Sequence, residues 1–161
     1  MRDATAPIGD RSLRLLPLDA DNRWARYTRE RIAVEAAFGL DEPGARELVA
    51  QARARTRRLG LRMWLATDVG ERVVGGIGGF FLPAPHAAVA RLQEVDVFPE
   101  YRGAGLGDAL LEAARRRLAH DGARSLVVAA DEDDWPLGWY RRRGFLPVLR
   151  VAATDADGPP A

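Results

Sequence analysis

The chain contains no cysteine and no lysine among its 161 residues. The absence of cysteine excludes disulfides, thiolate metal sites and a cysteine nucleophile. Because lysine is absent, all 24 Lys and Arg positions are arginine, and the protein cannot acetylate lysine side chains of its own. No hydrophobic run approaches the length of a membrane span, and the first residues lack the apolar core of a signal peptide. We therefore expect a cytoplasmic protein without a membrane partner.

A strong net charge is also lacking. The formal net charge is +1, so there is no broad basic field and nucleic acid is not an expected partner. The two histidines, His86 and His120, stand apart from any ligand pattern, and no metal site is predicted.

The length fits one domain with its own core. Residues 1–11 are polar and predict a flexible arm, residues 12–151 the folded domain, and residues 152–161 a flexible, proline-containing tail. Hydrophobic periodicity predicts an α/β fold in the order β-α-α-β-β-β-α-β-α-β. The expected elements are a strand around 13–18, helices up to about 38 and over about 41–60, strands at 61–66 and 73–82, a central strand around 95–97, a helix from 106, a strand at 125–130, a helix at 135–143 and a last strand at 145–151.

The strand expected at 73–82 carries four glycines: Gly75, Gly76, Gly78 and Gly79. Glycines inside a strand indicate close approach by a ligand, a bent sheet or a β-bulge. The sequence leaves these alternatives open.

The central strand leads into a glycine turn and a helix. Val95 and Val97 alternate as in a strand, and Pro99 ends the ladder because it has no N–H to donate. Glycines follow at 103, 105 and 107, before apolar residues at helical spacing. The unpaired N–H groups at the start of that helix, together with the helix dipole, predict a binding site for a phosphate or pyrophosphate.

Three other interpretations of this turn compete with such a site. In the first, the turn only joins strand to helix and serves no ligand. A dinucleotide-binding turn requires G-x-G-x-x-G, whereas Asp108 stands at the last position. A nucleotide triphosphate loop requires Gly-Lys-Ser/Thr, and the chain has no lysine.

The segment Arg102-Gly103-Ala104-Gly105-Leu106-Gly107 resembles the R/Q-x-x-G-x-G/A signature of the GNAT superfamily of acyl-CoA-dependent N-acetyltransferases. Val97-Phe98-Pro99-Glu100-Tyr101 resembles the lead-in V-x-P-x-x-R of that family, and the order of elements over about 12–151 is also similar. The resemblance implies that acetyl-CoA is the cosubstrate. Its pyrophosphate would lie on the turn and its pantetheine arm beside the preceding strand. The implied binding residues are Val95, Val97, Arg102, Gly103, Ala104, Gly105, Leu106, Gly107 and Asp108.

A second segment, Trp139-Tyr140-Arg141-Arg142-Arg143-Gly144-Phe145, resembles the L/F-Y-x-x-x-G-F segment of the family. The resemblance places Tyr140 near the departing sulfur as a proton donor. Seven residues earlier Asp133 stands where the family often has asparagine, so Asp133 takes the place of a residue that contacts the cofactor arm. From the helical spacing of Trp135 and Trp139 we expect these two residues to pack one face, with Tyr140 turned away from it.

Because cysteine is absent, direct attack of an amine on the thioester is the simplest mechanism. Glu94 matches the glutamate of the family's E-x-x-V pattern and is the candidate base or anchor for the amine; Asp96 shares its face by period-two alternation. Trp24, Tyr27, Phe38, Trp64 and Phe80 are candidates either for an acceptor pocket or for the core.

The sequence therefore predicts an N-acetyltransferase that moves an acetyl group from acetyl-CoA to a primary amine, with Tyr140 and Glu94 as catalytic residues. The alternative is a non-catalytic acyl-CoA-binding or sensing module on the same fold. The acceptor is a small molecule or a peptide amine, and whether the protein forms a homodimer stays open.

Overall fold

The computed structural model describes residues 12–151, so the predicted arm and tail, 1–11 and 152–161, lie outside the described residues. The chain forms two compact units, one up to Val128 and one from Ala129 onward. Within the described range, no helix is both long and apolar enough to cross a membrane.

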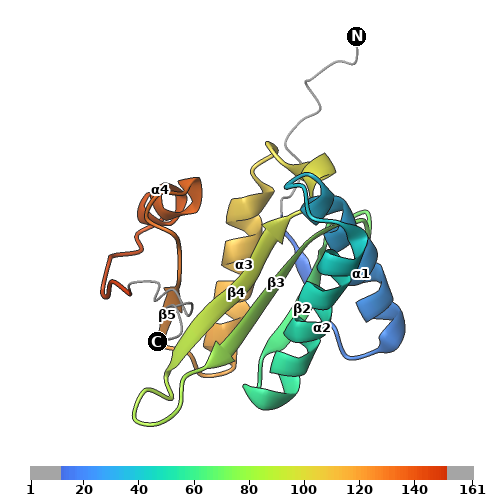
Figure 1. Cartoon of the computed structure of the whole chain (residues 1–161). Coiled ribbons are helices and arrows are strands. Elements are labelled where there is room, and N and C mark those ends of the chain that lie inside the picture. Colours follow the sequence, from blue (N-terminus) through green and yellow to red (C-terminus); the bar gives the residue numbers. More distant parts are fainter. Residues whose placement is uncertain (1–11, 152–161) are drawn as a thin grey trace, which may run out of the picture. The chain divides into compact units, whose positions relative to one another are not determined.

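The first unit is a five-stranded sheet with helices on both faces (Figure 1). The strands are β1 (Arg14–Pro17), β2 (Arg62–Thr67), β3 (Val73–Phe81), β4 (Val89–Val97) and β5 (Ser125–Val128). They lie in the order β1-β2-β3-β4-β5, antiparallel except for the parallel pair of β4 and β5. Helices α1 (Asp21–Ala36) and α2 (Glu42–Arg58) cover one face, and α3 (Leu106–His120) lies behind the sheet (Figure 1).

Local signals set the ends of α2. The Asp41 carboxylate accepts a hydrogen bond of 2.9 Å from the Gly44 N–H, and Pro43 occupies the first turn, where its missing N–H costs nothing. After the helix, Gly60 takes a φ of +64°, the left-handed conformation that is typical of a glycine just beyond a helix C-terminus. Helix α1 instead has Ala20 as its N-cap, and this residue makes no side-chain cap hydrogen bond.

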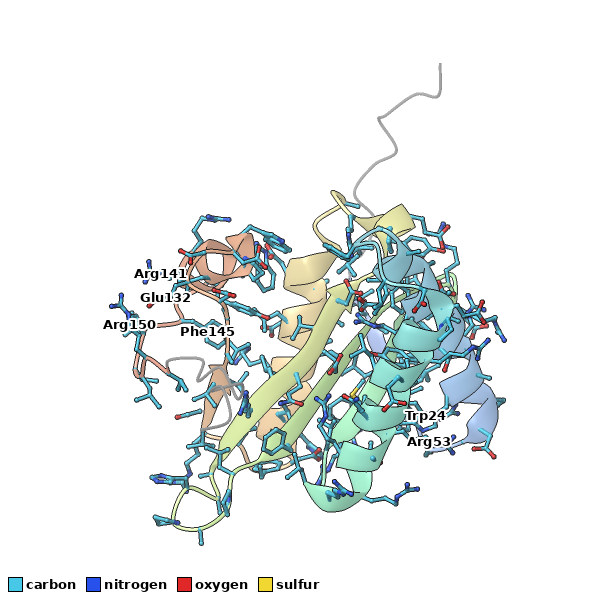
Figure 2. All side chains as sticks on the ribbon, in the orientation of Figure 1. Trp24, Arg53, Glu132, Arg141, Phe145 and Arg150 are labelled. Carbon is cyan, nitrogen blue, oxygen red and sulfur yellow. The ribbon has the colours of Figure 1, made fainter. Side chains whose placement is uncertain are left out.

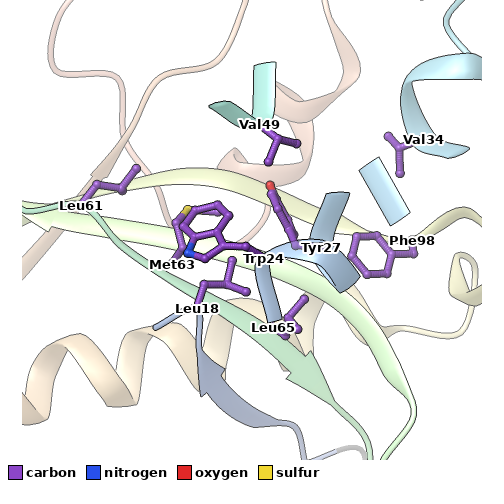
Figure 3. Packing of buried hydrophobic residues seen from close by; sticks show 9 residues of the cluster. All are labelled: Leu18, Trp24, Tyr27, Val34, Val49, Leu61, Met63, Leu65 and Phe98. Atoms are coloured by element: carbon purple, nitrogen blue, oxygen red, sulfur yellow. The ribbon is translucent and has the colours of Figure 1, made fainter. Parts of the chain in front are cut away.

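Helices α1 and α2 pack against each other and against β2. Arg53 of α2 lies over the Trp24 ring of α1, 5.5 Å from its centre, and pairs with Asp21 (Figure 2). Beneath this contact, Tyr27 lies among Trp24, Val49 and Phe98 in the core (Figure 3). The cluster comprises Leu18, Trp24, Tyr27, Val34, Val49, Leu61, Met63, Leu65 and Phe98.

The glycines of β3 accommodate the protein's own packing. A Cβ atom at Gly76 would lie 2.8 Å from the Tyr27 ring, and one at Gly78 would lie 2.5 Å from the Met63 sulfur. At Gly79 the neighbour is Leu118 of α3, at 3.1 Å. Close approach by core side chains thus explains these three glycines without a ligand.

The second unit contains α4 (Trp135–Arg141), whose N-cap Asp134 accepts a hydrogen bond from the Trp135 N–H. The predicted last strand, residues 145–151, is wrong: this segment contains no strand. Its apolar residues Leu146, Val148 and Leu149 are about four-fifths exposed, at 80%, 82% and 80%. The segment is joined to the start of the unit by the pair of Arg150 with Glu132 (Figure 2).

Candidate active site

A glycine turn joins the end of β4 to α3. Gly103 and Gly105 have φ angles of +78° and +74°, which glycine alone adopts without strain. Gly105 is the N-cap of α3, and having no side chain it provides no side-chain cap. A Cβ atom at Gly103 would meet no atom within 4 Å, so the turn is open there. The N–H groups at the start of α3 thus lie beside an open turn, an arrangement that suits a bound anion.

Among the other residues assigned to the turn, Ala104 and Asp108 are exposed, and Leu106 and Gly107 are half-buried in the first turn of α3. The guanidinium of Arg102 is directed back to the strand. Its Nε donates to the Val97 carbonyl at 2.8 Å, and its Nη2 donates to an Asp96 carboxylate oxygen at 3.1 Å.

A β-bulge interrupts β4 just before the turn. The register with β3 shifts between Gly76 and Gly78, where β4 contributes one residue more than β3. In this bulge Glu94 has a φ of +51°, in the left-handed region that side chains rarely adopt. Next to the bulge, a Cβ atom at Gly75 would lie 2.5 Å from the Asp96 carbonyl oxygen, so only glycine fits at this position of β3.

The bulge brings two consecutive side chains to one arginine. Neighbouring residues of a regular strand point to opposite faces, yet Gln93 and Glu94 both reach Arg55 of α2. The Arg55 Nη1 lies 3.2 Å from the Gln93 Oε1 and 3.4 Å from the Glu94 Oε1. Glu94 therefore lies on the face of the sheet that α1 and α2 cover.

Asp96 lies on the same face, as the alternation predicted. One carboxylate oxygen accepts a hydrogen bond of 3.1 Å from Arg31 of α1, and the other is bound by Arg102. The side chains of Arg31 and Asp96 are only 14% and 15% exposed, and Arg31 also pairs with Glu35. Burial raises the pKa of the Asp96 carboxyl, although both guanidinium groups act in the opposite direction.

The five aromatic residues that were candidates for an acceptor pocket differ in burial. Trp24, Tyr27 and Trp64 are at most 5% exposed and belong to the core, Phe80 is partly buried against it, and Phe38 is 72% exposed. Tyr27 nevertheless borders the charged residues: burial raises the pKa of its phenol, and Glu94 and Asp96 raise it further.

One edge of β4 is paired with another strand over only part of its length. Its parallel pairing with β5 runs from Val89 to Leu92 and stops where β5 ends, at Val128. Residues 93–97 continue the strand beyond that point. Within the first unit this stretch, which includes Val95 and Val97, is paired with β3 on one side and with no strand on the other.

Tyr140 belongs to the second unit. Its ring packs edge-to-face against Trp139 and Phe145, with ring centres 4.8 Å and 5.3 Å away. The expected burial pattern is reversed, because Tyr140 is buried at 6% exposure and Trp135 is 71% exposed. The ring contacts with Trp139 and Phe145 accompany the burial of Tyr140. Burial raises the pKa of Tyr140 to about 12.

Asp133 lies in the acidic turn before α4 and is exposed. Its backbone N–H donates to the Asp131 carboxylate at 3.3 Å, so the turn is stabilised by a side chain of its own. No cluster of metal-binding side chains occurs among residues 12–151.

Sequence reasoning missed Arg31, Arg55 and Gln93. Only Arg31 has a visible signal, because Glu35 follows it at the i+4 spacing of a helical ion pair. Arg55 is one of several arginines near the end of α2, and nothing in their spacing distinguishes it.

A sequence profile of the acetyltransferase (GNAT) family matches residues 29–145. The chain belongs to this family. The match includes β4, the glycine turn, α3 and α4, and confirms both the resemblance and the predicted fold class. It also agrees with the prediction of an acyltransferase.

The GNAT chain is similar to curated and solved proteins of the same kind. It is 37% identical over 84 residues to a mycothiol acetyltransferase of Pseudarthrobacter chlorophenolicus, covering 50% of this chain and 26% of that protein. The chain thus spans about a quarter of the length of such relatives.

Two solved structures show the same fold. A protein of Pyrococcus furiosus described as an acetyl transferase has a TM-score of 0.69 at 16% identity, with 89% of this chain and 99% of that chain covered. A predicted acetyltransferase of Clostridium acetobutylicum, solved with acetyl-CoA, has a TM-score of 0.62 at 14% identity, with 89% and 96% covered.

Proposed function

We propose that this GNAT protein transfers an acetyl group from acetyl-CoA to a primary amine by direct attack. The observation that carries the proposal is the continuous segment in which a bulged strand presents Glu94 and then passes through the open glycine turn into α3. A carboxylate that would meet the amine and an anion site are thereby held by one continuous segment of the chain.

The backbone of this unit fits acetyl-CoA. The N–H groups of residues 103–108 would bind the pyrophosphate, and Arg102 would help indirectly, because its guanidinium is engaged by Asp96 and the Val97 carbonyl. The unpaired edge of β4 at Val95 and Val97 offers backbone groups to the amides of the pantetheine arm, as an added strand would use them. The Val97 carbonyl would accept a hydrogen bond from the pantetheine arm in addition to the one that it accepts from Arg102.

In the reaction, the amine nitrogen bonds to the thioester carbon, the carbon–sulfur bond breaks, and one proton leaves the nitrogen while one reaches the sulfur. Glu94 would attract the ammonium form and pass its proton to solvent. Neutralising an amine of pKa ~10 at pH 7 costs roughly 4 kcal/mol. A nearby carboxylate favours the charged form of the amine, so Glu94 would act by attracting the cation and by relaying its proton through water. Tyr140 would donate to the sulfur, and Asp133 would contact the cofactor arm, as the resemblance implies.

The anion site is tested by adding charge to the turn without adding backbone strain. Ala104 is exposed and lies between the two glycines that need a positive φ. In Ala104→Glu we expect acetyl-CoA affinity to fall at least tenfold, because a carboxylate would face the pyrophosphate. Ala104→Gln introduces a side chain of nearly the same size without charge, and it should bind acetyl-CoA as the wild type does. Equal affinities of the Ala104→Glu and Ala104→Gln variants would reject the turn as the anion site.

Turnover separates the enzyme from an acyl-CoA-binding module. Because the protein has no cysteine, the thiol of released CoA is the only thiol in a purified reaction and can be followed with a thiol-reactive dye. Amine-dependent thiol release is expected of the enzyme. Acetyl-CoA binding without such release across an amine panel would support the non-catalytic module.

A further inference from the structure

The carboxylate proposed to meet the amine is not isolated. Glu94 lies 3.4 Å from Arg55, and the two side chains are 22% and 34% exposed, so both are accessible to a small ligand. Any acceptor whose ammonium group approaches Glu94 also approaches a guanidinium. A substrate with positive charge alone would meet repulsion there.

The surrounding charges are balanced. Among residues 12–151, the charged groups joined to residues 94–96 of β4 by ion pairs, directly or through one partner, are the cations Arg31, Arg55 and Arg102 and the anions Glu35, Glu94 and Asp96. Three charges of each sign give no net negative field. A site for a polyamine would need an excess of acids, which this cluster does not have.

Arg55 differs from the two other arginines of the cluster in how much of its guanidinium is used. Arg31 binds through Nη1 and Nη2, and Arg102 binds through Nε and Nη2. Arg55 uses Nη1 alone, shared between Gln93 and Glu94 at 3.2 Å and 3.4 Å. Its Nε and Nη2 have no hydrogen-bond partner within residues 12–151, and together they form the edge that binds a carboxylate through two parallel bonds.

We propose that the acceptor is a zwitterion, an α-amino acid whose amine lies at Glu94 and whose carboxylate binds Arg55. The inference rests on the proposed acetyl transfer and names its substrate class. An α-amino acid carries its two charges on groups attached to one carbon, which matches a carboxylate and a guanidinium in direct contact. Bound over this pair, it places each charge next to its opposite, whereas a simple amine leaves Arg55 facing a cation.

The test compares acceptors that differ only in the carboxylate. Leucine with 3-methylbutylamine and phenylalanine with phenethylamine are matched pairs, and spermidine serves as the polycation. With the wild type we expect kcat/KM for each amino acid to exceed that for its amine by about tenfold to hundredfold, the range of one charged hydrogen-bonding group. In Arg55→Met, KM for the amino acid should rise by a similar factor, and KM for the matched amine should stay unchanged or fall.

Two further variants make the assignment specific. Arg57→Met removes a charge from an exposed position of the same helix and should change neither preference. Arg55→Lys keeps the charge without the planar fork and should restore only part of the loss. Binding of the amino acids to the protein in the presence of CoA, followed by saturation-transfer NMR, gives a readout that needs no chemistry.

The outcomes separate the two proposals. Equal loss for amino acid and amine in Arg55→Met, a wild-type preference for the amine or for spermidine, or no Arg55-dependent binding of any amino acid by NMR would each overturn the zwitterion proposal. Amino acid binding that depends on Arg55 without any thiol release would support the amino acid site at Glu94 and Arg55 and reject acetyl transfer.

Discussion

The Asp96 carboxylate holds the guanidinium of Arg102, six residues later, at 3.1 Å. Its other oxygen binds Arg31 of α1, so one half-buried carboxylate connects the glycine turn to a helix far away in sequence. Both arginines are fixed by this contact, which orients the turn from the side of the sheet covered by α1.

We therefore expect Asp96 to contribute more to the positions of Arg31 and Arg102 than to the stability of the folded protein. Its pKa is raised above the usual 3.8, so the folded state binds its proton more tightly than the unfolded state does. Stability from this group is then present below the usual pKa and is lost as the pH rises through the raised value. Compared with Asp96→Asn, the wild type should become relatively less stable from about pH 3 to pH 7, as measured by urea unfolding.

The same variant should weaken acetyl-CoA binding several-fold, because Arg102 loses an anchor that orients the turn. Asp121→Asn provides a control, since that carboxylate also pairs with two arginines, Arg62 and Arg117, but lies at the far end of α3. A constant stability difference across the pH range, together with unchanged acetyl-CoA affinity, would contradict this role for Asp96.

The positive φ of Glu94 predicts an unusual order of stability. Glycine normally destabilises a strand relative to alanine, but at a φ of +51° only glycine is free of steric strain. Glu94→Gly should therefore be more stable than Glu94→Ala by about 1 kcal/mol, although both lose the carboxylate. Chemical denaturation of the two variants measures the difference directly. If the alanine variant is the more stable one, the bulge does not hold its conformation in solution.

Removal of charge from Glu94 at constant shape tests its part in the reaction. Glu94→Gln should reduce turnover most where the amine is protonated, and should recover partly as the pH approaches ~10 and the amine loses its proton unaided. Rates measured at saturating acceptor from pH 6 to 10, roughly the titration range of amines, give the profile. A loss that is the same at every pH would argue against proton transfer. An increase in acceptor KM alone would indicate an anchor.

Tyr140→Phe tests the proton donor with little change in packing, because the ring contacts to Trp139 and Phe145 remain. Full transfer from a phenol of pKa about 12 to a thiolate of pKa ~8.5 is uphill by roughly 5 kcal/mol, so the hydroxyl must act while charge develops on sulfur. We expect kcat to fall about 10²-fold and acetyl-CoA affinity to stay nearly unchanged. If a folded variant retains most of the rate of the chemical step, then water and not Tyr140 supplies the proton to the sulfur.

Local chemistry explains what could be predicted from sequence. The caps of α2 depend on Asp41, Pro43 and Gly60, which act on their immediate neighbours. The glycine turn likewise depends on the positive φ angles of Gly103 and Gly105, and closely spaced glycines in a sequence indicate such a turn. For this reason the strand, turn and helix around 95–120 could be placed from the sequence.

The predicted strand at 145–151 failed for the opposite reason. A hydrophobic, β-prone run becomes a strand only when another strand supplies the hydrogen bonds of its ladder, and no periodicity encodes that partner. Leu146 and Val148 show the pattern of a strand and yet remain exposed.

The sequence by itself determined the order of the elements up to α4, the open turn before α3 and the presence of carboxylates at 94 and 96, because these follow from residues adjacent in the chain. Only the tertiary structure decided that Glu94 lies in a bulge opposite the stretch between Gly76 and Gly78, that Gln93 and Glu94 share Arg55, and that Arg31 reaches Asp96. These contacts join residues 38 to 65 positions apart. Such pairings arise because α1 and α2 pack against the sheet. Packing brings together residues that are close in space, and the spacing of residues along the chain does not show which residues these are.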